Sequence, residues 1–187
     1  CRGTAVSDPH KRGFLKGVLA LGVPLVGCGA KPLRFAFLGG LTGPNADLGV
    51  GGRDAVELAV EAHNQRRGAG VVELVVFDSH RPPDTYPALL AAVQQAGVQA
   101  VVGPMTSGVA THWIPLANAA KLLTVSPTVT SSDFSGHSDW FYRVCSSTQD
   151  YGRRSAEHHV QKMGWKRVAI VRDDGNAAYT RTWASHF

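Results

Sequence analysis

Residues 33–40 read Leu-Arg-Phe-Ala-Phe-Leu-Gly-Gly, a short apolar run that ends at two glycines. A run of this length with such an end is typical of a buried β-strand. Strand patterns recur at 71–77, 100–102, 122–125, 140–144 and 167–171, and helical patterns occur at 52–67, 85–96, 109–120, 150–163 and from Tyr179 onward. This alternation predicts an α/β fold, a doubly wound parallel sheet.

Ligands of such sheets bind beyond the carboxyl ends of the strands, so the loops at 39–48, 103–108 and 126–132 are the candidate binding loops. None of them contains Lys or Arg, and their glycines fit neither the GxGxxG pattern nor a P-loop. Hydroxyl side chains and free N–H groups at a helix start suit a single carboxylate. We therefore expect no nucleotide there and no cofactor.

The N-terminal region has the pattern of an export signal. A basic stretch at 10–16 precedes an uncharged apolar run at 17–27, which is too short for a membrane-spanning helix of about 20 residues. Leu25-Val26-Gly27-Cys28 resembles a bacterial lipobox, so residues 1–27 are interpreted as export signal and upstream residues, and Cys28 as the lipidation site. A buried core helix is the alternative. Tat and Sec export both stay open, because the basic stretch has Lys11 in the first arginine place of the twin-arginine pattern.

Charge and cysteine content exclude several classes. The whole chain of 187 residues carries a net charge of +5, but 15 basic against 13 acidic residues remain once the signal is set aside. No run of basic residues interleaved with aromatics is present, which argues against nucleic acid as a partner. The three cysteines form no CxxC or Cys/His cluster, so no disulfide framework or metal site is expected. The sequence contains no GxSxG elbow, which argues against a hydrolase. We therefore expect that the protein is not an enzyme.

Several short motifs together resemble the type I periplasmic binding proteins, most of all their leucine/isoleucine/valine-binding branch. They are Phe35-Ala36-Phe37-Leu38-Gly39, Leu41-Thr42-Gly43-Pro44, Val102-Gly103-Pro104-Met105-Thr106-Ser107, Val125-Ser126-Pro127-Thr128-Val129-Thr130 and Phe141-Tyr142-Arg143-Val144. Family members are about twice this long and have two similar lobes. The resemblance implies that residues 28–140 form the first lobe and that 141–187 form a crossover and the start of a truncated second lobe.

The resemblance also implies a binding site. The matching positions give the candidate ligand-binding residues Ser107, Thr128, Thr130, Leu48, Thr106 and Tyr179. Ser107, Thr128 and Thr130 would hold the carboxylate of an amino acid, Leu48 would lie over its side chain, and Tyr179 would close the cleft. Five of them have a structural alternative: Thr106 and Ser107 suit a helix cap, Thr130 a turn, Leu48 a core or loop contact and Tyr179 simple packing. His80 and Thr106 occupy the places of the family's first-lobe disulfide.

The implied function is that of an exported, lipid-anchored solute-binding protein, periplasmic or on the outer face of the cytoplasmic membrane. It would capture an amino acid of the branched-chain type between its lobes and deliver it to the permease subunits of an ABC importer. A ligand-sensing receptor module, an amide- or urea-binding transport receptor and an enzyme on a doubly wound fold are the alternatives, because a fold does not decide function.

Overall fold

A five-stranded parallel sheet organises the chain, of which the computed structural model describes residues 31–66 and 70–187. Its strands are β1 (Leu33–Gly39), β2 (Val72–Asp78), β3 (Ala100–Val102), β4 (Leu123–Ser126) and β5 (Phe141–Arg143). They lie in the order β2-β1-β3-β4-β5. The chain moves outward from β1 to β2 and then returns to place β3 on the other side of β1, so the sheet has a switch point between β1 and β3. The predicted α/β fold is confirmed.

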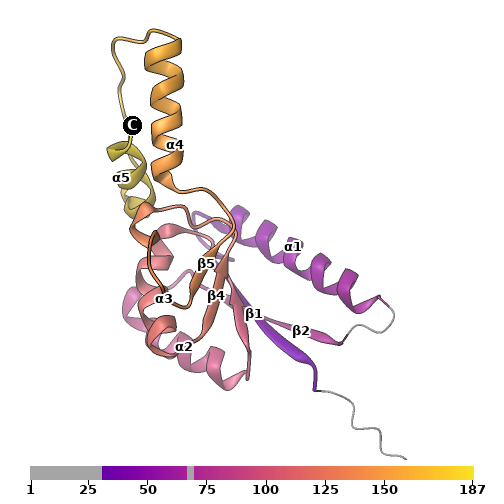
Figure 1. The fold of residues 1–187 in the computed structure, drawn as a ribbon. Coiled ribbons are helices and arrows are strands. Elements are labelled where there is room, and N and C mark those ends of the chain that lie inside the picture. Colours follow the sequence, from indigo (N-terminus) through magenta and orange to yellow (C-terminus); the bar gives the residue numbers. More distant parts are fainter. Residues whose placement is uncertain (1–30, 67–69) are drawn as a thin grey trace, which may run out of the picture.

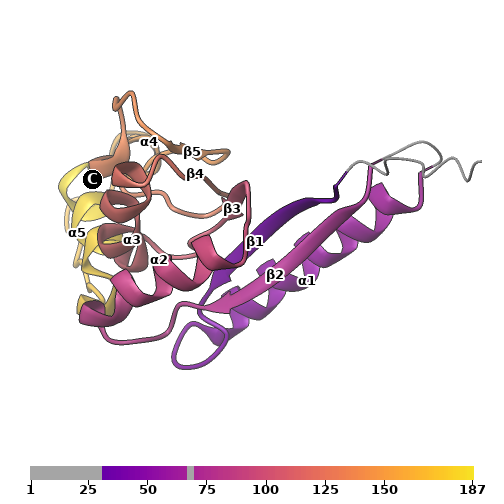
Figure 2. The ribbon, with the colours of Figure 1, turned by 90° about the horizontal axis from the view of Figure 1, so that it is seen from below.

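Helices cover both faces of this sheet (Figure 2). Helix α1 (Ala46–Asn64) lies on one face, and α2 (Tyr86–Gln95) and α3 (Ser107–Ala119) lie on the other. Side chains alternate along β1, so that Ala36 and Leu38 belong to the core beneath α2 and α3 while Phe35 points toward α1. The near-continuous apolar character of β1 is thus explained by burial on both faces.

The largest fully buried side chain of the core is Trp113 on α3. It packs in one cluster with Leu38, Leu89 and Val101, and its Nε1 donates to Thr124 Oγ1 at 3.3 Å. The indole N–H therefore keeps a hydrogen-bond partner inside the apolar core, as buried tryptophans usually do.

Two helix predictions differ from the structure by more than two residues at an end. Helix α1 begins at Ala46, six residues before the predicted start, because the glycines at 49, 51 and 52 do not interrupt it. A Cβ at Gly49 would lie 1.9 Å from the Gly40 carbonyl oxygen, so glycine lets the helix start approach the β1–α1 loop. At the C-terminal side, the predicted helix 150–163 is an α-helix only over α4 (Thr148–Ala156) and continues as π-type turns over Glu157–Lys162.

The predicted strand at 167–171 is wrong. Residues 164–173 form no helix or strand, and within the described residues no neighbouring strand pairs with them. The chain then enters a short 3-10 turn, Asp174–Asn176, and helix α5 (Ala177–Ser185), which lies beside α4 (Figure 1). An apolar pattern alone does not make a strand when no partner strand satisfies its backbone groups.

The proposed signal and Cys28 lie outside the described residues. Within 31–66 and 70–187, no helix combines the length and apolar character needed to cross a bilayer.

Candidate functional site

A cavity of about 690 Å³ with many polar residues in its walls opens at the switch point of the sheet. Its walls come from the loops after β1 and β2, from the start of α3 and from the segment 173–181. We call it the switch-point cavity, and its polar lining residues are Thr42, Asn45, Ser79, His80, Arg81, Tyr86, Thr106, Thr111, His112, Asp173, Asp174 and Arg181. Its position agrees with the expectation that ligands bind beyond the strand ends.

Asp78, at the end of β2, holds two walls of this cavity together. Its carboxylate accepts hydrogen bonds from Leu41 N at 2.8 Å, Thr42 Oγ1 at 2.7 Å and His80 N at 2.9 Å. Burial by itself would raise the pKa of the Asp78 carboxyl, but the hydrogen bonds from His80, Thr42 and Leu41 favour the charged form and leave the pKa lowered overall. Gly43 (φ 79°) follows in the same loop, against the His80 ring.

The start of α3 forms the floor of the cavity, and its first N–H groups already have acceptors within the chain. Thr106 is the N-cap, since its Oγ1 accepts from Val109 N at 3.3 Å. Gly108 N donates to Asn176 Oδ1 at 2.8 Å. An oxygen atom of the 174–176 turn therefore sits where a helix start would receive a carboxylate oxygen.

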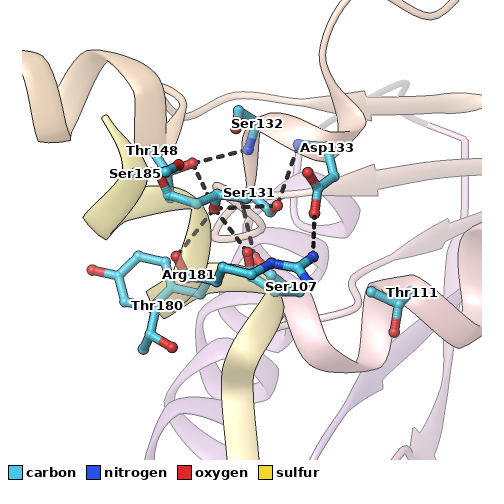
Figure 3. A network of polar contacts seen from close by, with 12 residues as sticks. Ser107, Thr111, Ser131, Ser132, Asp133, Thr148, Thr180, Arg181 and Ser185 are labelled. Atoms are coloured by element: carbon cyan, nitrogen blue, oxygen red, sulfur yellow. Dashed lines mark hydrogen bonds and ion pairs between the residues drawn. The ribbon is translucent and has the colours of Figure 1, made fainter. Parts of the chain in front are cut away.

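Ser107 is 2% exposed and belongs to a network of hydroxyl groups beneath the cavity (Figure 3). Its Oγ accepts from Ser131 N at 3.2 Å. Thr182 Oγ1 of α5 lies 3.4 Å from Ser131 Oγ and accepts from Thr148 Oγ1 at 2.9 Å, while Ser132 N donates to Thr148 Oγ1 at 2.9 Å. The network joins the β4–β5 loop and the starts of α3 and α4 to α5.

The six residues predicted from the resemblance do not meet in one cavity. Thr106 lines the switch-point cavity and Ser107 lies buried beside it. Leu48 and Thr128 line a separate apolar groove of about 820 Å³ along α1, with Val56 and Met105 among its other walls; we call it the α1 groove. Thr128 Oγ1 donates to Met105 O at 2.6 Å, which ties this loop to the segment that precedes α3.

The remaining two candidates have structural contacts. The Thr130 carbonyl accepts from Thr148 N at 2.7 Å. Tyr179 is 37% exposed on α5, and its carbonyl accepts from Thr182 Oγ1 at 3.1 Å. The cap contact expected of Thr106 is present, since its Oγ1 accepts from Val109 N.

Sequence reasoning missed Asn176, Ser79 and Asp78 as residues of the site. Asp78 carried a readable signal, because it is the first polar residue after an apolar strand. Asn176 carried none, since its contact with Gly108 joins residues 68 positions apart. Asp173 and Asp174 also line the cavity, and Asp173 Oδ1 accepts from Gly175 N at 2.8 Å.

Residues 32–184 match the family described as Periplasmic binding protein. The Leu/Ile/Val-binding protein BraC3 of Rhizobium johnstonii is 30% identical to this chain over 161 residues, which are 83% of this chain and 42% of that protein. The chain thus spans less than half the length of the relatives it matches.

Two solved structures share the fold. One is the branched-chain amino acid transporter substrate binding protein LivJ from Streptococcus pneumoniae in complex with isoleucine, with a TM-score of 0.75, 23% identity and coverage of 83% of this chain and 45% of LivJ. The other is a solute binding protein of an ABC transporter from Rhodopseudomonas palustris in complex with 3,4-dihydroxybenzoic acid, with a TM-score of 0.64, 19% identity and coverage of 83% and 44%. These relatives are solute-binding proteins rather than enzymes. Together with the match over 32–184, they confirm the predicted resemblance, and the chain belongs to the periplasmic binding protein family.

Proposed function

We propose that this chain is the ligand-binding region of an exported amino-acid-binding protein that serves an ABC importer. The switch-point cavity carries this proposal, because it places a helix start and several hydroxyl groups at the edge of the sheet where such folds bind ligands. The Rhizobium relative bears the name of a Leu/Ile/Val-binding protein, and the Streptococcus structure holds isoleucine, which supports an amino acid as the class of ligand.

In this proposal the α-carboxylate of the ligand binds at the start of α3. Thr106 and Gly108 line the cavity at this helix start, and Ser107 lies between them in the sequence. The partial positive charge of a helix N-terminus favours an anion there, as does the absence of an acidic residue from the first turn of α3. Asn176 has to release Gly108 when the carboxylate arrives.

The proposal extends to domain arrangement and location. Residues 28–140 form the first lobe, 141–187 form the crossover and the start of the second, and the ligand is held between the two. Cys28 carries the lipid that anchors the protein outside the cytoplasmic membrane. The family match supports export, and the lipobox-like stretch supports the anchor.

A second candidate ligand is an aromatic carboxylic acid. The rings of Tyr86 and His112 stack at 5.6 Å with an angle of 26° between their planes, and both residues line the cavity. Together with the benzoate-type ligand of the Rhodopseudomonas protein, this pair supports a ligand that stacks on aromatic groups. A sensing module and an amide-binding receptor are further variants of the same fold.

Thermal unfolding of the full-length gene product against a panel of ligands tests the proposal. The panel holds the amino acids, simple amides, urea and hydroxybenzoates. A bound ligand at one hundred times its Kd adds about 2.7 kcal/mol of stability. We expect one or a few amino acids to raise the midpoint in the unaltered protein but not in Gly108→Pro, which removes the N–H. A midpoint that rises with amides or benzoates but with no amino acid would contradict the amino-acid assignment.

A further inference from the structure

The two hollows of the molecule differ in chemical character. The α1 groove, where Leu48 and Thr128 lie, has walls made mostly of aliphatic side chains. The switch-point cavity has two arginines, two histidines, a tyrosine and three threonines in its walls, and its apolar members are small or short: Pro44, Pro83, Val109, Ala177 and Ala178. A ligand whose carboxylate binds at the start of α3 therefore extends along polar walls, and not against Leu48.

One buried hydroxyl in the wall of this cavity has no partner. Ser79, just after β2, is 1% exposed, and among the described residues nothing forms a hydrogen bond with its Oγ. Its backbone is fully used, because Ser79 N donates to Gly39 O at 2.8 Å and its carbonyl accepts from Tyr86 Oη at 2.9 Å. Buried polar groups of native proteins nearly always have partners, so an orphan in a cavity wall indicates that a ligand or water completes it.

Arg81 is the basic side chain beside Ser79. It follows His80 in the same loop, and His112 of α3 stacks on the neighbouring Tyr86. Arg181 lies on the α5 side of the cavity, 3.7 Å from Asp133. Arg81 Nε donates to the Asp78 backbone carbonyl at 3.0 Å, which holds one edge of the guanidinium group. The acidic residues of the lining, Asp173 and Asp174, belong to the opposite segment.

Building on the amino-acid function proposed above, we propose that this cavity selects an amino acid whose side chain ends in a carboxylate or a carboxamide. Its α-carboxylate occupies the start of α3, its ammonium group lies toward Asp173 and Asp174, and its terminal oxygen accepts from Ser79 and Arg81. An aliphatic side chain would bury these polar groups without hydrogen-bond partners. Such unpaired groups strongly weaken the binding of an aliphatic amino acid.

Calorimetric titration of the full-length gene product with L-glutamate, L-glutamine and L-leucine tests this. We expect L-glutamate or L-glutamine to bind about tenfold or more tightly than L-leucine. Arg81→Gln should weaken the binding of L-glutamate more than that of L-glutamine. Ser79→Ala should weaken the binding of both, while the midpoint of thermal unfolding without ligand stays level or rises. Arg154→Gln, an exposed arginine on α4, is the matched control and should leave all three affinities unchanged.

The outcomes separate the two proposals. If L-leucine binds most tightly, the preference for polar side chains is overturned and the amino-acid function stands. If no amino acid binds while amides or benzoates do, the amino-acid function itself is overturned. Unchanged affinity for L-glutamate in both Ser79→Ala and Arg81→Gln would contradict the assigned contacts even where L-glutamate binds best.

Discussion

The sheet and its helices, residues 33–143, differ sharply from the segment that follows them. In the first region every strand has a partner and the interior holds Trp113, Leu38 and Val101 with almost no exposure. In the second, Val171 is 96% exposed and the stretch 164–173 has no regular structure. The two regions have similar apolar patterns in the sequence. The difference shows that a strand pattern is realised only where neighbouring strands and covering helices are present.

The helices α4 and α5 belong to the second region and attach it to the first. Hydroxyl groups join them to the sheet region. Thr148 belongs to the network of Figure 3, and its Oγ1 donates to Thr182, whose Oγ1 lies 3.4 Å from Ser131 Oγ. Such a junction depends on hydrogen-bond geometry, so it should open at a smaller cost than the core of the sheet.

The largest effect is expected in the sheet region. Trp113→Ala removes a fully buried indole and its bond to Thr124, and should lower the free energy of unfolding by about 3–5 kcal/mol. Val171→Ser, in the exposed segment, should change it by less than about 0.5 kcal/mol. Urea denaturation of both variants measures the contrast, and similar losses in the two would show that the segment 164–173 is packed as firmly as the core.

A smaller effect is expected at the junction. Thr182 is 6% exposed, and Thr182→Val removes its hydroxyl, which contacts Ser131, Thr148 and the Ala178 carbonyl. We expect the free energy of unfolding to fall by about 1–3 kcal/mol. Hydrogen exchange should show α5 opening before the strands, and Thr182→Ser should retain most of the protection. Uniform loss of protection across sheet and α5 would contradict a separate junction.

Asp78 gives a pH-dependent test within the sheet region. Asp78→Ala should lower the free energy of unfolding by about 1–2 kcal/mol at pH 7, a value that allows for partial solvent screening of the carboxylate. Because the folded-state pKa is lowered from 3.8, this contribution is present above the unfolded pKa and is lost as the pH falls through the folded pKa. The stability difference between the two proteins should therefore shrink as the pH falls below 3.8. A difference that is constant across this range would exclude the charged carboxylate as its source.

The smallest effect is expected at the contact between the two regions. Asn176→Ala removes the acceptor of Gly108 N and should lower stability by about 0.5–1 kcal/mol. In the proposed site it should also strengthen amino-acid binding, because the ligand carboxylate no longer competes with the amide oxygen. Asn176→Asp, which keeps the acceptor and adds charge, should weaken binding. Titration of the two variants side by side measures this, and equal affinities would contradict the competition.

Much of the sheet was predictable from local pattern. The strands at 100–102 and near 33–38 match the structure closely, since short apolar runs between glycines or helices have few other solutions. Gly97 ends α2 with φ 67°, as its position after an Ala- and Gln-rich helix indicates. The strand at 167–171 was beyond such reasoning, because whether it forms depends on partners that no local pattern reveals.

The candidate site was only partly predictable. Thr106 and Ser107 stand at a helix start that the sequence already marks, and both lie at the switch-point cavity or directly beneath it. Ser79, Asn176 and the separation of Leu48 from the cavity depend on how distant segments fold together. Their roles could be read only from the three-dimensional arrangement.

The central claim is that the start of α3 receives the α-carboxylate of the ligand. Nuclear magnetic resonance with ¹⁵N-glycine labelling follows the Gly108 amide directly while an amino acid that stabilises the protein is titrated. We predict that this resonance shifts and saturates together with binding, and that the corresponding amine without its carboxylate leaves it in place. A Gly108 resonance that stays unchanged when the protein is saturated with the amino acid would contradict the claim.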